Sequence, residues 1–396
     1  MAMLSVEEAH ARLMALFAPI GAERVGLADA AGRVLAEDSV AARAQPPFPA
    51  SAMDGYAVRA ADLAACGPLR VVGTAQAGAR FQGRVGPGEA VRIFTGAPVP
   101  EGADAIVIQE DAEREGDAIV PRPERDEAAY IRPAGTDFAE GARLEAPRRL
   151  GPSEVALLAA MNVAEVAVTR RPVVALVPTG DELVWPGEAP GPDQIVSSNN
   201  FGLKALLEAE GAEARLLPIA RDTVESLEAV FGLAEGADLI VTLGGASVGD
   251  HDLVQKTALG RGLALDFYKV AMRPGKPLMA GRLGATPLVG LPGNPVSAMV
   301  CGHVFLRPAI RAMLGLGGDP ITPLSGTLAE PVEANGPRTH YMRGRAERGP
   351  DGWRVTAFGR QDSALLSVLV AANALILRPP GDPARAAGEA VRFLPI

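Results

Sequence analysis

The chain has 396 residues, which is too long for one hydrophobic core and predicts two to four domains. Its composition, 48% hydrophobic and 21% charged, is that of a soluble globular protein, and its net charge of −9 argues against binding to nucleic acid or an acidic membrane. Two cysteines are too few for a disulfide framework, so we expect a cytoplasmic protein.

The predicted elements of the N-terminal part are one helix and then mostly strands. Residues 1–20 place apolar side chains at helical spacing with charges between them, which predicts an amphipathic helix rather than a signal segment. A strand-and-turn stretch follows to about residue 40. Short apolar runs between turns over residues 41–138 predict a β-rich domain, and a helix is expected near residues 151–161.

Beyond residue 171 apolar strands alternate with helices, a pattern typical of a parallel sheet covered on both faces. Strands are expected at residues 173–177, 213–220 and 238–243, and helices at residues 201–210 and 223–234. After residue 320 the pattern returns to β-type alternation, which predicts a small C-terminal β domain.

Three Gly- and Pro-rich turns each follow an apolar run of this central region, at residues 242–250, 273–277 and 291–297. Such turns let backbone N–H groups approach a ligand closely, and ligands of parallel sheets bind beyond the carboxyl ends of the strands. Asn294 followed by Pro295 predicts a capped helix start whose positive end faces the same edge. We therefore expect the three turns to form one anion site.

Lysine usage supports this expectation, because the chain has only four lysines among 38 basic residues. Lys256, Lys269 and Lys276 all fall in this region, where a compact ammonium group suits an anion. Lys276 lies in the turn at residues 273–277 and is the lysine that we expect to contact a ligand. Lys256 is expected to be a solvated helix residue.

Three acids near the same edge, Glu182, Asp222 and Asp252, suit Mg²⁺, which prefers oxygen ligands and substrate phosphates. Asp222 with Glu225 also has the form of a capping box, so its position alone favours capping over metal binding. Asp250 has the position of a helix cap, which leaves Asp252 as the better ligand candidate. Four scattered histidines and two cysteines argue against zinc or another soft metal.

A second cluster lies in the β-rich domain, where Asp54 and Thr95 occur in turns. No Ser/His/Asp or Cys/His arrangement suggests a nucleophilic hydrolase, and the dinucleotide and P-loop motifs are absent.

Together these motifs resemble the MoeA family of molybdopterin molybdenumtransferases, which includes the E domain of gephyrin. The matching segments are SAMDGYAVR at 51–59, IFTGAPVPEGADAIV at 93–107, PTGDEL at 178–183, GGASVGDHD at 244–252, RPGKP at 273–277 and LPGNPVSA at 291–298. The resemblance spans essentially the full length, although the Gly-Gly loop is shared with the smaller molybdopterin adenylyltransferases. Arg273 stands where some relatives have Lys, which replaces a point contact with a planar fork.

The resemblance implies a multidomain α/β and β protein that forms a homodimer. The implied parts are an N-terminal helix (1–21) packed on the central domain, a small linking α/β domain (22–40 and 142–169), a β-rich lid domain (41–141), a central doubly wound parallel-sheet molybdopterin-binding domain (170–317) and a C-terminal β domain (318–396).

The implied reaction joins molybdate and adenylylated molybdopterin to give molybdenum cofactor and AMP, with Mg²⁺. The resemblance assigns catalytic roles to Asp54 and Thr95 of the partner subunit's lid, and to Glu182, Asp222, Lys269, Arg273 and Lys276. It assigns substrate binding to Gly244, Gly245, Ser247, Gly249, Asp252, Pro292, Gly293, Asn294 and Pro295, with Glu182, Asp222 and Asp252 at the metal.

Two other functions remain open, namely molybdopterin adenylyltransferase activity and a gephyrin-like scaffold that binds partner proteins. Molybdopterin adenylyltransferase and the apoproteins of molybdenum enzymes are possible partners, whereas nucleic acid and membranes are not expected.

Overall fold

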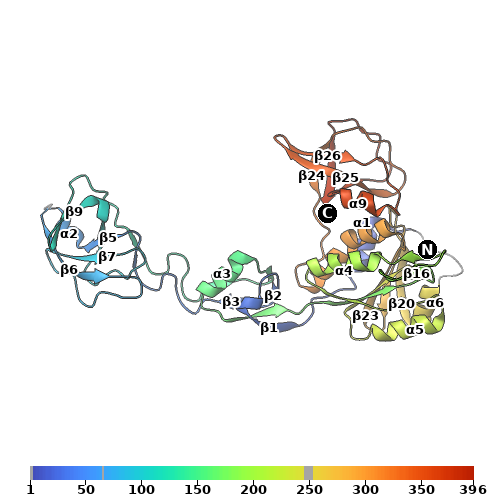
Figure 1. Cartoon of the computed structure of the whole chain (residues 1–396), viewed down its shortest axis with the longest axis horizontal. Helices are drawn as coiled ribbons and strands as arrows, with labels where there is room; N and C mark the ends of the chain where they lie inside the picture. Colours follow the sequence, from blue (N-terminus) through green and yellow to red (C-terminus); the bar gives the residue numbers. More distant parts are fainter. Residues whose placement is uncertain (1–2, 65–66, 245–252) are drawn as a thin grey trace. The chain divides into compact units, whose positions relative to one another are not determined.

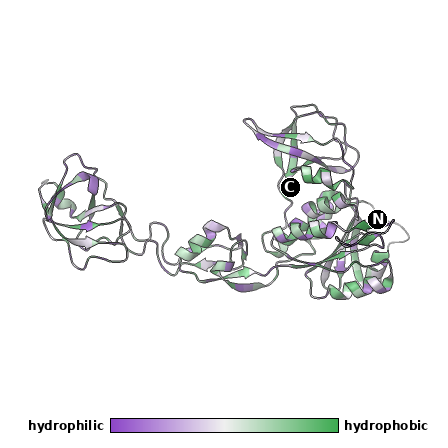
Figure 2. Ribbon diagram, viewed as in Figure 1, coloured by the Kyte–Doolittle hydropathy of each residue, from purple (hydrophilic) through white to green (hydrophobic). Residues whose placement is uncertain are grey.

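The computed structural model describes residues 3–64, 67–244 and 253–396, and the chain divides into two compact units (Figure 1). One unit is Arg24–Val168, and the other combines Met1–Glu23 with Thr169–Ile396. Many helices are banded in purple and green in Figure 2, as expected for elements with one face toward a core. Within the residues described, no helix has both the length and the hydropathy needed to cross a membrane.

Where the chain enters and leaves the first unit, four short strands form a sheet with α3 (Pro152–Ala160) packed on it. Their order is β1 (Ala22–Gly26), β14 (Glu165–Thr169), β2 (Val34–Leu35) and β13 (Arg148–Arg149). α3 begins with Pro152 at its first position, and the Glu154 carboxylate accepts the Gly151 N–H at 3.0 Å. Leu35, Leu158 and Met161 form part of the shared core.

The rest of this unit is β-rich, as the sequence predicts. Its six-stranded sheet has the order β8 (Ala105–Ile108), β5 (Gly55–Val58), β7 (Glu89–Ile93), β6 (Leu69–Ala75), β10 (Ala118–Pro121) and β9 (Ala112–Glu115). All four residues of β5 are buried, with Tyr56 and Val58 in one apolar cluster and Ala57 in another. Because neighbouring residues of a strand point to opposite faces, both faces of the sheet are covered. The smaller elements are β3 (Ser39–Val40) paired with β12 (Arg143–Leu144), β4 (Ala50–Ser51) paired with β11 (Ile131–Arg132), and α2 (Ala60–Leu63).

The central sheet of the second unit has six strands. Their order is β18 (Glu213–Leu216), β15 (Val173–Pro178), β19 (Leu239–Leu243), β23 (Thr286–Leu291), β22 (Pro277–Leu283) and β20 (Leu263–Lys269). The first four strands are parallel, as predicted, but β22 runs antiparallel to both of its neighbours, so the sheet is mixed. Only Gly284 and Ala285 separate β22 from β23. A connection of two residues can join two antiparallel strands but not two parallel ones, so β22 must run antiparallel to β23.

Helices cover both faces of this sheet (Figure 1). α5 (Val224–Leu233) and α6 (Leu253–Gly260) pack on one face, while α4 (Asn199–Ala209) and α7 (Pro295–Cys301) contact each other and the sheet on the other. The predicted helices at 201–210 and 223–234 are therefore confirmed. α7 continues through a π-helical turn into α8 (Arg307–Met313), against which the N-terminal helix α1 (Val6–Met14) packs.

The C-terminal strands close into a barrel. β25 (Thr339–Gly349), β26 (Gly352–Ala357), β24 (Leu324–Leu328), β28 (Ala390–Pro395) and β27 (Ala374–Arg378) follow one another, and β27 also pairs with β25. Closure leaves no free strand edge among these five. The two-residue strand β21 (Met272–Arg273) of the central domain adds to β25. The turn at residues 273–277 is therefore attached directly to the barrel.

Candidate active site

Three strands of the central sheet end at the same level. Pro178 of β15 pairs with Leu243 of β19, which pairs with Leu291 of β23. The chain proceeds from β15 to β18 on one side of the sheet and to β19 on the other. The carboxyl ends of β15 and β19 therefore flank a topological switch point, where open α/β sheets bind their ligands.

Gly244, the first residue after β19, is held in a conformation that favours glycine. Its φ is +99°, its N–H donates to the Leu291 carbonyl at 3.1 Å, and a Cβ there would lie 2.7 Å from the Thr179 carbonyl oxygen. A Cβ on Gly293 would lie 3.6 Å from the Gly244 Cα, so these two turns are in close contact. The other predicted residues of this loop, Gly245, Ser247, Gly249 and Asp252, lie outside the described residues.

The turn after β23 is braced from two directions. The Asn199 Nδ2 of α4 donates to the Gly293 carbonyl at 2.7 Å, and the Val296 N–H of α7 donates to the Ser363 carbonyl at 3.0 Å. α7 begins at Pro295 as predicted, but Asn294 caps it without a side-chain hydrogen bond. The Asn294 side chain is thus not used for the predicted capping contact.

The acids form one end of this edge. Asp181 and Glu182 follow β15, and Asp222 follows β18; the Asp222 N–H donates to the Asp181 carboxylate at 3.1 Å. Partial burial raises the pKa of the largely exposed Asp222 carboxylate, and the nearby carboxylates of Asp181 and Glu182 raise it further. Within the described ranges, no group of three His, Cys, Asp or Glu side chains is gathered closely enough to hold a metal ion by itself.

The capping role predicted for Asp222 is wrong. The N-cap of α5 is Thr223, whose hydroxyl accepts the Ser226 N–H at 3.1 Å. Asp222 lies one residue before the cap, where its carboxylate is exposed and does not serve the helix. The structure thereby removes the structural explanation that competed with a functional role for Asp222.

The assignment of the N-cap to Thr223 rather than Asp222 can be tested by measuring the stability of two variants. Thr223→Ala is expected to lower the free energy of unfolding by about 1 kcal/mol, the usual effect of losing an N-cap. Asp222→Ala is expected to leave it unchanged or slightly higher, because it removes repulsion among carboxylates. Trp185 and Trp353 are the chain's two tryptophans and both lie in the second unit, so tryptophan fluorescence in denaturant follows this unit alone. Equal losses in the two variants would restore the capping interpretation.

The basic residues form the other end of the edge. Lys269 ends β20 and is level with Pro277 at the start of β22, so residues 270–276 lie at the same edge as the carboxyl ends of the parallel strands. Arg273 and Lys276 are exposed, and the Lys269 Nζ lies 4.8 Å from the centre of the Tyr268 ring. Three to five strand spacings of about 4.8 Å separate the strands that carry the acids from those that carry the basic residues, which places the two ends roughly 14 to 24 Å from each other. Glu182, Pro292 and Lys276 therefore share one surface.

The sequence analysis missed Arg343, which belongs to this region. Its side chain on β25 is 1% exposed, and its Nη2 has no hydrogen-bond partner among the described residues. Its Nε and Nη1 make long contacts of 3.4 Å with Gln361 Oε1 and the Leu365 carbonyl. These partners come from the segment whose Ser363 carbonyl contacts α7, and β25 pairs with the basic turn through Arg273 and His340.

A buried guanidinium with an unsatisfied N–H group is costly, and its burial lowers the pKa of Arg343. Such a group is well suited to receive an anion, because the anion would supply the missing acceptor. Arg343 lies in a segment of ordinary β-type alternation, so the sequence alone does not indicate that it binds an anion. We therefore add Arg343 to the basic end as a candidate anion ligand.

Asp54 and Thr95 contact each other in the first unit. The Thr95 N–H and hydroxyl each donate to Asp54 Oδ1 at 2.7 Å, which lowers the pKa of Asp54 and keeps it ionised at neutral pH. Arg92 lies beside them, with its guanidinium carbon 5.1 Å and 4.8 Å from the ring centres of Tyr56 and Phe94. The two residues predicted for the lid thus form one hydrogen-bonded acid–hydroxyl pair.

Comparison with known proteins covers nearly the whole chain. Residues 4–162 match the MoeA N-terminal region (domain I and II), residues 175–312 match a probable molybdopterin binding domain, and residues 325–396 match the MoeA C-terminal region (domain IV).

The full-length relatives include the molybdopterin molybdenumtransferase of Haemophilus influenzae, which is 36% identical over 99% of this chain and 98% of that protein. Molybdopterin molybdenumtransferase 2 of Mycobacterium tuberculosis is 38% identical over 98% of each chain. The crystal structure of the molybdopterin biosynthesis MoeA protein of Pyrococcus horikoshii OT3 superposes with a TM-score of 0.85 at 27% identity, covering 100% of both chains.

Proposed function

The chain belongs to the MoeA family, and from this membership we propose that it is a molybdopterin molybdenumtransferase of molybdenum cofactor biosynthesis. It would insert molybdenum from molybdate into adenylylated molybdopterin and release AMP. The observation that carries the proposal is the charge arrangement at the edge of the central sheet. Exposed basic side chains lie at one end of this edge and carboxylates at the other, with the closely packed glycine turns after β19 and β23 between them.

The basic end suits molybdate. Arg343 offers a buried N–H that has no acceptor among the described residues, and Lys276 offers an exposed ammonium on the adjoining turn. Both would bind molybdate and orient it through charge-assisted hydrogen bonds. Since the reaction brings together two anionic substrates, positioning and charge neutralisation matter more than a protein nucleophile.

The acidic end suits Mg²⁺. Asp222 and Glu182 fit as its carboxylate ligands, because Mg²⁺ is usually held by one or two carboxylates together with substrate phosphates, and a cation would relieve the repulsion that raises the pKa of Asp222. Bound there, Mg²⁺ would balance the charge that develops on the leaving phosphate.

The test is AMP release from adenylylated molybdopterin. We expect it to require both molybdate and Mg²⁺, and Asp222→Asn to lower the rate while leaving the unfolding transition unchanged. ATP with free molybdopterin serves as the control for the adenylyltransferase alternative, and pyrophosphate formation there without molybdate-dependent AMP release would contradict the proposal.

We also propose that the enzyme is a cytoplasmic homodimer in which Asp54 and Thr95 of one subunit act on the central domain of the other. Coexpressing Asp54→Ala and Lys276→Gln chains, each inactive alone, tests this directly. Random pairing makes half of the dimers mixed, and each mixed dimer has one site with both residues intact, so about a quarter of wild-type activity should return. A site built within one chain would show no recovery.

A further inference from the structure

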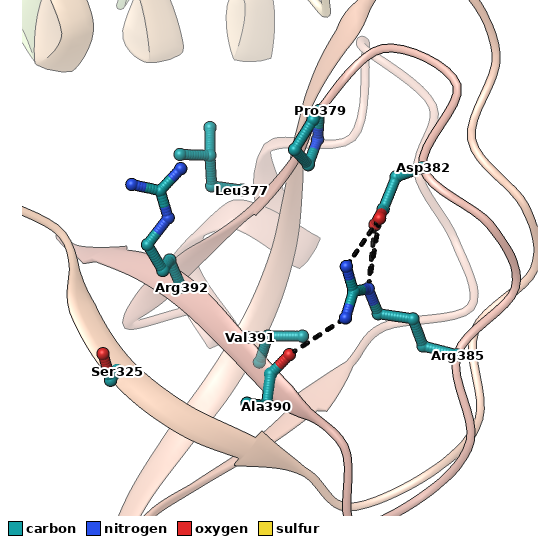
Figure 3. Close-up of a pocket in the computed structure, with 8 residues that line it drawn as sticks. All are labelled: Ser325, Leu377, Pro379, Asp382, Arg385, Ala390, Val391 and Arg392. Carbon is teal, nitrogen blue, oxygen red and sulfur yellow. Dashed lines mark hydrogen bonds and ion pairs between the residues drawn. The ribbon is translucent and has the colours of Figure 1, made fainter.

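A pocket with both polar and apolar side chains lies on the C-terminal barrel, and its lining includes none of the residues assigned to the candidate active site (Figure 3). It has a volume of about 260 Å³. The residues that define it are Ser325 on β24, Leu377 on β27, Arg392 on β28, and Pro379, Asp382 and Arg385 on the loop between β27 and β28.

Arg392 lies on β28, the middle one of three neighbouring strands whose order is β24, β28 and β27. It is level with Ser325 on one side and with Leu377 on the other. Across the described part of the chain, neither the Arg392 guanidinium nor the Ser325 hydroxyl has a hydrogen-bond or ion-pair partner. An open guanidinium fork therefore lies next to an open hydroxyl and an apolar side chain.

The acid in the pocket wall is already neutralised. Asp382 is 7% exposed and lies between Arg378, which is 1% exposed, and Arg385. Arg385 donates to the two Asp382 oxygens at 2.7 Å and 3.0 Å, and its Nη1 donates to the Ala390 carbonyl at 3.4 Å (Figure 3). These hydrogen bonds, from Arg385 first and then from Arg378, lower the pKa of Asp382, so the carboxylate stays ionised and paired.

The charges of the wall consequently favour an anion. Arg385 and Arg392 face Asp382 in the lining, a surplus of one positive charge in a chain whose net charge is −9, and the buried Arg378 pairs with Asp382 from outside the lining. The Arg378–Asp382–Arg385 group fixes the loop, which leaves Arg392 as the cation that is free to bind a ligand. A fork of this kind recognises carboxylate and phosphate groups with two parallel hydrogen bonds.

We propose that this pocket binds a small organic anion, in which a carboxylate or a phosphate monoester is attached to a compact apolar group. Arg392 and Ser325 would hold the anionic group, and Leu377 and Pro379 would contact the apolar part. A water molecule takes up about 30 Å³ in the liquid, so the pocket exceeds the needs of one water or a bare oxyanion.

Calorimetric titration of the full chain with benzoate and with phenyl phosphate tests the proposal and separates the two anion types. We expect at least one probe to bind, less tightly at high salt. Arg392→Gln should weaken this binding at least tenfold and Ser325→Ala by a smaller factor, while Arg392→Lys should fall between Gln and wild type. Arg348→Gln, an exposed arginine of the same barrel outside the pocket, is the matched control and should have no effect.

Because the candidate active site also attracts anions, the titrations are repeated with Lys276→Gln. Binding that survives Lys276→Gln and is lost with Arg392→Gln belongs to the barrel pocket and supports the proposal, whatever the outcome for molybdate-dependent AMP release. Absence of binding by both probes, or binding that Lys276→Gln removes and Arg392→Gln does not, would overturn it.

Discussion

Arg343→Met is expected to reduce molybdate-dependent AMP release by about 10² to 10³, the usual effect of removing one preorganised donor from an anion site. Methionine keeps the length of the side-chain stem but removes the guanidinium. The Gln361 Oε1 acceptor keeps its 3.0 Å hydrogen bond from the Arg343 backbone N–H in this variant. The loss therefore falls on the bound anion rather than on the barrel.

The same substitution is expected to leave stability equal or higher. Arg343 is 1% exposed, its Nη2 has no partner among the described residues, and its other side-chain contacts are 3.4 Å long. A buried charge with such weak compensation destabilises the folded state, and replacing it with an apolar side chain that keeps only the stem relieves that cost. Lost activity together with retained stability is typical of a functional residue and not of a structural one.

Molybdate itself supplies a readout that does not depend on turnover. A ligand that binds only the folded state at 100 times its Kd stabilises it by about 2.7 kcal/mol. Molybdate should therefore raise the unfolding midpoint of the wild-type protein and of the exposed control Arg348→Met, but not that of Arg343→Met. If Arg343→Met unfolds more easily and still responds to molybdate, Arg343 is a structural residue.

Much of the central fold was predictable because its signals are local. Buried apolar runs and helical periodicity placed β15, β19, α4 and α5 close to their observed bounds. Turns at strand ends likewise predicted that Glu182, Pro292 and Lys276 share one edge, since parallel strands bring their carboxyl ends together. The antiparallel strand β22 was not foreseen, because its direction depends on the short connection to β23 rather than on its composition.

The errors at the site come from contacts between distant parts of the chain. Asp222 and Thr223 are both good N-cap residues, and Glu225 favours the box that begins at Asp222. The structure selects Thr223, with the Asp222 N–H bound instead to Asp181, which lies 41 residues away in the chain. Arg343 was missed for a related reason, because only tertiary packing shows that it is buried without a full set of partners.

Acidification from pH 7 to pH 5 is expected to destabilise the second unit by about 4 kcal/mol, chiefly through two histidines. Burial lowers the pKa of His303 to about 4, and Arg307 contributes. Burial, together with Arg273 and three other arginines, lowers the pKa of His340 to about 4. The unfolded chain takes up these protons near pH 6.5 while the folded protein does not, so stability falls with pH from about 6.5 to about 4.

At pH 5 this difference amounts to about 2 kcal/mol for each histidine. Asp238 and Asp382 do not add to it, because their pKa values are lowered in the folded protein and their contribution is lost only under more acidic conditions. The raised pKa of Asp222 acts in the opposite sense. Burial also lowers the pKa of His10, so this third histidine adds to the loss in the same direction, while His303 and His340, whose pKa values fall to about 4, contribute the largest part.

Denaturant titrations at pH 7, 6 and 5, followed by tryptophan fluorescence, measure the effect in this unit alone. His303→Met removes one titrating group whose Nδ1 has no partner among the described residues, so this variant should keep about half of the pH dependence. Trp353 lies in the same barrel as His340 and Trp185 in the same domain as His303, so the fluorescence change reports on both parts of the unit. A midpoint that stays constant between pH 7 and pH 5 would mean that both imidazoles accept protons in the folded protein without penalty, and that their burial does not shift the titration.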